Sequence, residues 1–101
     1  MSAKTKFLPP IHPGEVLKED FLEPMGISIN RLSRDLLVPP NRISAIVNGK
    51  RAITADTALR LGKYFGVSPE VWTGLQADYE IRCLRQTAWP KIEPRIHSAA
   101  A

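Results

Sequence analysis

Residues 28–51 read SINRLSRDLLVPPNRISAIVNGKR, in which apolar side chains recur every three or four positions. This spacing places them on one face of a helix, so the stretch predicts two short amphipathic helices. The segment LVPP separates the two helices, because proline fixes φ and lacks a backbone N–H. A tight turn therefore joins them. The predicted inward side chains are Leu32 and Leu36 in the first helix and Ile43, Ile46 and Val47 in the second.

The second of these helices is short. It is predicted to run from about Pro40 to Asn48, since proline suits a first helical position and Asn48-Gly49 suits a helix end. A helix of this length does not persist alone in water, so its geometry depends on packing its apolar side chains against a core. A helix seated in this way presents its outer side chains rigidly, as a recognition element must.

The outward positions of the same stretch are polar and mostly basic. From Asn30 to Arg51 there are five basic residues and a single acidic residue, Asp35. Such a concentration of positive charge suits the phosphate backbone of a nucleic acid. The outward residues are Arg31, Arg34, Asn41, Arg42, Ser44, Asn48, Lys50 and Arg51.

The composition indicates one small folded domain. The chain has 101 residues, of which 44% are hydrophobic and 24% charged, with a formal net charge of +4. A single cysteine, Cys83, excludes an intrachain disulfide and fits a reducing cytosol. Residues 1–6 are polar, and no apolar run is long enough to span a membrane. We therefore expect a cytoplasmic protein without a membrane segment.

The rest of the chain is predicted to be helical, with loose ends. Residues 1–11 are expected to form a flexible arm, and a first helix begins at 12–15, HPGE, and ends at Pro24 and Gly26. Ser28 is expected to cap the next helix. Further start signals, TAD at 54–56 and SPE at 68–70, predict a fourth helix ending at Gly66 and a fifth extending to about Arg85. Residues 87–101 are predicted to be a frayed tail. No strand pattern occurs in the sequence, so residues 12–86 are expected to form a five-helix all-α domain.

Four ordered motifs stand out in the chain: HPGE at 12–15, GKRAITADTALRL at 49–61, SPEVW at 68–72 and LQADY at 75–79. Together they resemble the HigA-type antitoxins, a branch of the phage-repressor-like (XRE) helix-turn-helix regulators. The resemblance covers roughly residues 12–85, and it implies a lambda-repressor-like DNA-binding domain whose third helix enters the major groove. It also implies a homodimer that binds a palindromic operator in its own promoter and neutralises an RNA-cleaving HigB toxin.

The resemblance also implies roles for individual residues. The base-facing positions of the family fall on Pro40, Asn41 and Arg42, followed by Ser44 and Ala45 along the exposed side. Asparagine pairs with adenine and arginine with guanine, each contact giving ~1–3 kcal/mol of discrimination. The expected phosphate contacts are Ser28, Asn30, Arg31, Asn48, Lys50 and Arg51.

Two positions depart from the family pattern. Ile29 replaces a polar residue that often contacts phosphate, so Asn30 or Arg31 is expected to take that role. Leu37 replaces a glycine that is common in the turn. Because leucine does not take left-handed backbone cheaply, the turn is expected either to follow another path or to store strain.

The remaining distinctive residues favour structural interpretations. Dimer contacts are predicted at Tyr79, Ile81 and Leu84, because an apolar stripe continues along the fifth helix beyond the needs of a core. Phe65 and Trp72 have helical register and are predicted to pack in the core or a dimer, as is Tyr79, rather than to stack on single-stranded nucleic acid. A plain solvated face is predicted for Arg60, Lys63, Arg82 and Arg85.

The sequence offers no set of residues suited to catalysis. His12 and His97 lack a clustered second metal ligand, and Cys83 has no partner base. We therefore expect no enzymatic activity and no cofactor. Three functions remain open. They are an antitoxin that represses its own operon, a stand-alone XRE regulator without a toxin, and an adaptor whose basic stretch contacts an acidic protein.

Overall fold

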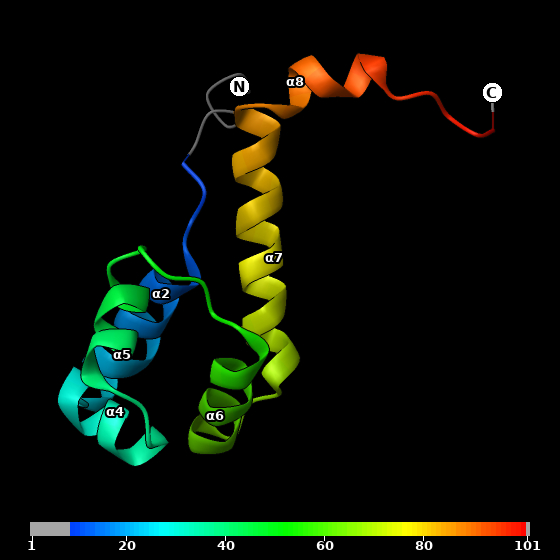
Figure 1. The fold of residues 1–101 in the computed structure, drawn as a ribbon. Coiled ribbons are helices and arrows are strands. Elements are labelled where there is room, and N and C mark those ends of the chain that lie inside the picture. The colour runs from blue at the N-terminus through cyan, green and yellow to red at the C-terminus, as the bar shows by residue number, and fades with distance from the viewer. Residues whose placement is uncertain (1–8, 101) are drawn as a thin grey trace.

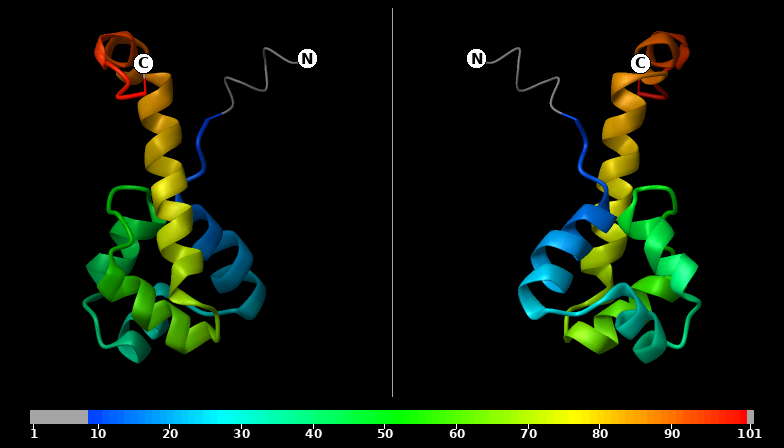
Figure 2. Two further views of the ribbon diagram at one scale, coloured as in Figure 1. Left: turned by 90° about the vertical axis from the view of Figure 1, so that its right-hand side faces the viewer. Right: turned by 90° about the vertical axis from the view of Figure 1, so that its left-hand side faces the viewer.

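The computed structural model describes residues 9–100, so most of the predicted flexible arm lies outside the described residues. The described part contains no strand, and α2 to α6 pack around the first half of a long helix, α7 (Figures 1 and 2). The second half of α7 extends away from this body, and α8 lies across its end. The all-α prediction is confirmed. The helices are α2 (Pro13–Val16), the π-helix η1 (Leu17–Leu22), α3 (Glu23–Met25), α4 (Ile29–Leu36), α5 (Pro40–Val47), α6 (Ala55–Phe65), α7 (Pro69–Gln86), α8 (Trp89–Ile92) and the 3-10 helix η2 (Glu93–Arg95).

The first helical segment is continuous through α2, η1 and α3. The prediction that Pro24 ends it is wrong, because Pro24 lies in the first turn of α3. The Glu23 N–H bonds to the Lys18 carbonyl, five residues back, so the α-helical bonding pattern is already interrupted where proline follows. Gly26 ends the segment as predicted, with a left-handed φ of 65°.

Helices α4 and α5 form the predicted pair joined by a tight turn. Ser28 caps α4, as expected, by accepting a hydrogen bond from the Arg31 N–H at 3.0 Å. In the turn, Leu37 takes a left-handed backbone with φ 61° and ψ 43°. Of the two expectations for this position, strain is therefore the one realised, since left-handed backbone costs a non-glycine residue ~1–2 kcal/mol. The side chain of Leu37 is 83% exposed, whereas Leu36 and Val38 beside it are buried.

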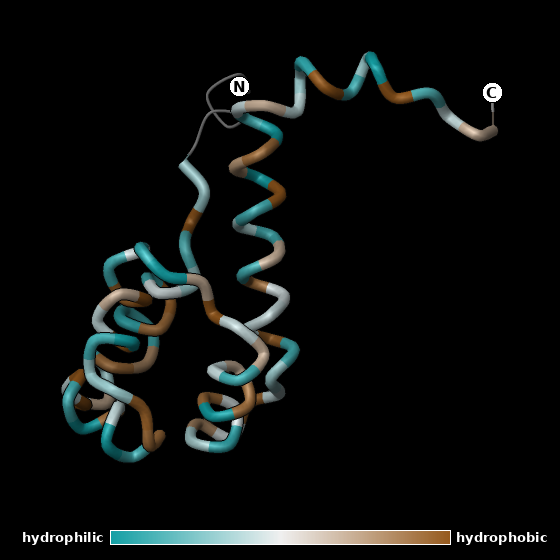
Figure 3. The backbone as a smooth tube through the Cα atoms, viewed as in Figure 1, coloured by the Kyte–Doolittle hydropathy of each residue, from teal (hydrophilic) through white to brown (hydrophobic). Residues whose placement is uncertain are grey.

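The core lies where α2, α4, α5 and α6 meet the first turns of α7. Phe21 packs against Phe65 and Trp72, with ring centroids 4.8 and 5.1 Å apart. Trp72 is fully buried, which confirms the prediction that it is a core residue. Figure 3 shows that apolar residues also occur along the outer half of α7. The buried hydrophobic residues are Leu17, Leu22, Ile27, Leu32, Leu36, Val38, Ile43, Ile46, Ile53, Ala58, Leu61 and Trp72.

The chain beyond α7 differs from the sequence expectation in local structure. The structure forms a short sixth helical segment at α8, followed by η2, where a frayed tail was expected. Both elements begin with a proline in the first turn, a position where the missing N–H loses no helical bond. The prolines that indicated a broken tail therefore start helices instead. None of the helices within residues 9–100 has the length and hydrophobicity needed to cross a membrane.

Candidate DNA-binding surface

Helix α5 is held by its apolar face. Ile43 and Ile46 are fully buried and Val47 is partly buried against the core, which confirms the predicted inward side. On the opposite side Pro40 and Asn41 are exposed. Ser44 and Ala45 are half-buried. The face that the sequence assigned to base contacts is therefore the one turned away from the core.

A shallow groove separates the start of α4 from the start of α5. It brings expected phosphate residues, Ser28 and Asn30, next to expected base residues, Pro40, Asn41 and Ser44. The two sets lie at the starts of α4 and α5, and the turn between these helices brings them together.

The seat of α5 depends on a close approach that sequence reasoning missed. Gly14, in α2, lies so near the end of α5 that an added Cβ would be 1.7 Å from the Ile46 carbonyl oxygen. A side chain does not fit there, so the backbones of α2 and α5 pack directly. From the sequence alone, HPGE is interpreted as a helix start and as a family motif, without a role for its glycine in packing. Its glycine also fixes how α5 packs on the domain.

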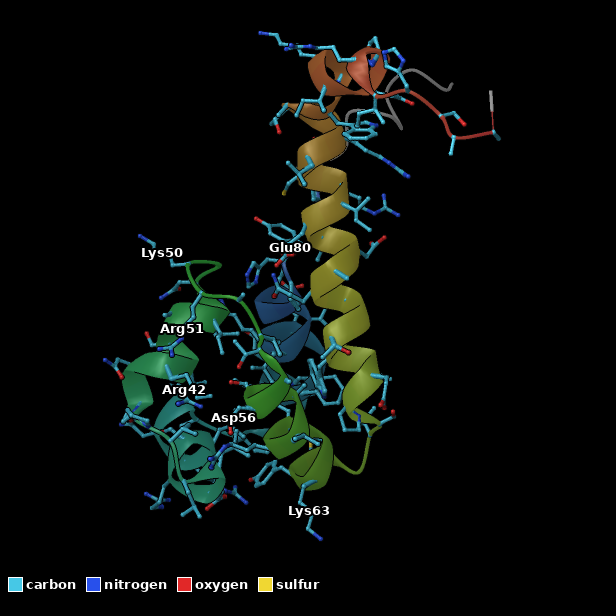
Figure 4. The ribbon with its side chains drawn as sticks, turned by 45° about the vertical axis from the view of Figure 1, so that its right-hand side comes forward. Arg42, Lys50, Arg51, Asp56, Lys63 and Glu80 are labelled. Atoms are coloured by element: carbon cyan, nitrogen blue, oxygen red, sulfur yellow. The ribbon has the colours of Figure 1, made fainter. Side chains whose placement is uncertain are left out.

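The basic loop after α5 is attached to α7. Lys50 and Arg51 are exposed in this loop, and Figure 4 shows Lys50 at its outer edge. The buried Gln76 of α7 accepts a hydrogen bond from the Ile53 N–H at 2.9 Å and donates to Glu80 at 2.9 Å. The bond to Ile53 holds the end of the loop against α7, and the bond to Glu80 orients the Gln76 amide. In the sequence, Gln76 belongs to the LQADY motif, but the motif predicts no contact for it.

His12 holds the other side of the same loop. Its Nδ1 accepts from the Gly14 N–H at 2.9 Å, and its ring is hydrogen-bonded to the backbone of Arg51. The ring also packs edge-on against Tyr79, with centroids 4.8 Å apart. Burial lowers the pKa of His12, an effect partly opposed by the bond to Arg51. The neutral imidazole therefore joins α2, the basic loop and α7.

Arg42 is paired within the protein. Its Nη1 donates to Asp56 Oδ2 at 2.7 Å, and the same oxygen accepts from Arg60 Nε at 3.0 Å. Arg60 in turn donates to the Leu36 carbonyl at 2.8 Å. The prediction that Arg60 lies on a plain solvated face is wrong, because it links α6 to the end of α4. Figure 4 shows Arg42 and Asp56 facing one another between α5 and α6, with Lys63 pointing away.

The same network sets the charge state of the acid. Hydrogen bonds from Arg60 and Arg42 lower the pKa of Asp56, so the carboxylate stays ionised beside the basic surface. Sequence reasoning treated Asp56 as part of a helix start signal. Its contact with Arg42 joins positions 14 residues apart, which no local pattern reports.

The remaining predicted residues fall in two places. Arg31 lies 3.8 Å from Asp35, and Asn48 is exposed at the end of α5. On α7, the side chains of Ile81 and Leu84 are 49% and 55% exposed, whereas Tyr79 is half-buried against His12. The residues predicted for a dimer are thus divided between an exposed apolar stripe and an internal contact.

These features define the class of protein. A short helix with a buried apolar face and an exposed polar face follows another across a tight turn, and a basic loop comes next. That is the arrangement of a helix-turn-helix domain. The chain belongs to the HTH_3 helix-turn-helix family, which matches residues 18–72.

Individual relatives and solved structures are similar to this chain over most of its length. The virulence-associated protein I of Dichelobacter nodosus is 48% identical over 79 residues, which are 78% of this chain and 73% of that protein. A HigA-family addiction module antidote protein from Coxiella burnetii is 46% identical, with a TM-score of 0.84 over 90% of this chain and 99% of its own. The antitoxin HigA of Pseudomonas aeruginosa, solved with the higBA promoter, is 39% identical, with a TM-score of 0.85 over 89% and 98% of the two chains. The predicted resemblance to HigA-type antitoxins is confirmed.

Proposed function

We propose that this protein is the DNA-binding antitoxin of a type II toxin–antitoxin system. It binds a palindromic operator as a homodimer, represses its own operon and neutralises a HigB/RelE-like toxin that cleaves mRNA. The observation that carries the proposal is the exposed polar face of α5. The opposite, apolar face of this helix is buried in the core, and the basic loop follows it in the chain. The similarity to an antitoxin solved with its promoter, over nearly the whole of both chains, supports it.

Base recognition is assigned to the outer face of α5. Asn41 is exposed at its first turn, where an amide can pair with adenine. Arg42 follows it and is suited to guanine. Pro40, Ser44 and Ala45 complete the surface that enters the major groove.

Phosphate contacts lie on both sides of that face. Lys50 and Arg51 follow α5, and their contribution is independent of sequence and sensitive to salt. The other expected phosphate contacts are Ser28, Asn30, Arg31 and Asn48.

Dimerisation is assigned to the outer half of α7. Ile81 and Leu84 expose apolar side chains there, and Tyr79 lies on the same helix. A second copy that covers this stripe would bury it and place two α5 helices on one duplex. The half-sites are then expected about one helical turn, roughly 34 Å, apart.

The DNA-binding part is tested with duplexes from the region upstream of the gene. Asn41→Ala and Arg42→Ala are each expected to lower discrimination at particular base pairs by roughly 5- to 100-fold. Lys50→Ala is expected to weaken binding to all duplexes and to lower the salt slope by about 1. Affinity measured against single-base-pair variants at several salt concentrations separates these effects. Unchanged base preference in both α5 variants would refute the assignment.

The partner is tested separately. Co-expression with the product of the neighbouring gene, followed by pull-down, is expected to recover a complex and to relieve growth arrest. Operator binding without any such complex would indicate a stand-alone regulator. If no duplex is bound at low salt, the basic stretch serves a protein contact instead, as in an adaptor. The proposal is one of binding in the cytoplasm, without catalysis.

A further inference from the structure

The ion pair between α5 and α6 restrains the side chain assigned to guanine. Arg42 extends from the recognition helix, and Asp56 lies in the first turn of α6. The Arg42 side chain is 24% exposed and that of Asp56 is 54% exposed, so the pair lies at the surface rather than within the core. The contact therefore holds Nη1 of Arg42 while part of the Arg42 side chain stays accessible.

The geometry limits which atoms of Arg42 remain available. Nη1 is bonded to Asp56 at 2.7 Å, and Nε is buried without a hydrogen-bond partner. Among the described residues, Nη2 donates to no group. The bond to Asp56 thus restrains the side-chain conformation of Arg42 within the protein itself.

The Asp56 carboxylate is also held by a second arginine, Arg60. Arg60 binds the same carboxylate oxygen at 3.0 Å and is tied to the Leu36 carbonyl at 2.8 Å. The network therefore spans the end of α4, the start of α5 and the start of α6. A carboxylate fixed in this way defines a position for Arg42 that a freely rotating acid would not.

We propose that Asp56 is a positioning residue that aims Arg42 at its base and thereby sets base preference at that operator position. The inference rests on the proposed function. An arginine whose rotamer is already fixed loses less conformational entropy when it contacts a base. A mismatched base meets a hydrogen-bond donor that is not free to move toward a different acceptor. The same carboxylate adds a negative charge near the phosphates, which weakens binding to every duplex.

The two effects of Asp56 have opposite signs, and this makes the role testable. Removing the charge with Asp56→Asn is expected to raise affinity for an unrelated duplex by about two- to fivefold. The same change is expected to lower discrimination at the base pair read by Arg42 by about three- to tenfold. A residue that served only folding would weaken binding to operator and unrelated duplex together.

Two further variants separate charge from position. Asp56→Glu keeps the charge but moves the carboxylate by one methylene, so discrimination is expected to fall while affinity for the unrelated duplex stays unchanged. In an Arg42→Ala background, Asp56→Asn is expected to have no further effect on base preference. Glu23→Gln is the control, because Glu23 in α3 forms a surface ion pair of 4.0 Å with Lys18 and is not among the residues assigned to DNA or to the dimer. It is expected to leave discrimination unchanged.

The measurement is the affinity of the full-length protein for its operator, for operator variants at each base pair and for an unrelated duplex. Thermal unfolding of each variant reports whether the fold is retained. If Asp56→Asn and Asp56→Glu leave every base preference unchanged while Arg42→Ala alters one, the inference is refuted and the proposed function stands. If Arg42→Ala also alters none, the assignment of Arg42 to a base fails as well.

Discussion

Replacing Gly14 with alanine tests how α5 packs against α2. Gly14 lies in the first helical turn, where helix propensity alone favours alanine by at most about 1 kcal/mol. The added Cβ would, however, be 1.7 Å from the Ile46 carbonyl oxygen and 2.6 Å from its carbon. Real Cβ contacts do not fall below 3.0 Å, so the backbone of α5 or α2 must shift by more than 1 Å.

The steric effect outweighs the propensity gain. Overpacking of this kind costs typically about 1–3 kcal/mol, and a backbone obstacle that cannot rotate away puts Gly14→Ala at the upper end. The net destabilisation is then about 2 kcal/mol. For a domain of this size each kcal/mol shifts Tm by roughly 4–8 °C, so a fall of about 8–16 °C is expected.

Gly74→Ala is the matched control for this measurement. Gly74 lies within α7, and an added Cβ there meets none of the described atoms within 4 Å. Only the propensity gain remains, so Tm is expected to rise by about 2–8 °C. Thermal unfolding followed by circular dichroism reports both variants. A Gly14→Ala protein at least as stable as the wild type would show that α2 and α5 do not meet as described.

Two further changes probe the turn and the basic loop. Leu37→Gly is expected to raise the free energy of unfolding, measured by chemical denaturation, by about 0.5–1 kcal/mol. The strain relieved at this left-handed position exceeds the extra conformational entropy that glycine gives the unfolded chain. A loss of stability would contradict the presence of strain at Leu37. The pKa of His12 is lowered in the folded state, so the folded protein binds fewer protons than the unfolded chain. The stability that His12 contributes is therefore complete above its ordinary pKa of 6.5. It is lost as the pH falls toward the pKa of His12 in the folded state. His12→Gln is expected to flatten that pH dependence, and an equal slope in the variant and the wild type would exclude His12 as the cause.

Features that depend on neighbours in the chain were predictable from the sequence. The cap at Ser28 joins groups three residues apart, and the end of the first helix at Gly26 follows from its left-handed backbone. The inward positions of Ile43 and Ile46 follow from helical spacing. These choices are local because capping and amphipathic periodicity act within one or two helical turns. They were enough to predict two short helices joined by a tight turn, together with the outward face of the second helix.

Features that join distant parts of the chain were decided by the tertiary structure. The sequence placed Arg42 on the exposed face but could not report that Asp56 holds it, since the two meet when α5 packs beside α6. Gly14 is required because the backbone of α5 lies too close to leave room for a side chain. Leu37 takes a left-handed backbone, which glycine adopts most easily, because the turn joins two helices whose apolar faces are both buried. Packing fixes such distances and dihedral angles, and local pattern carries no information about them.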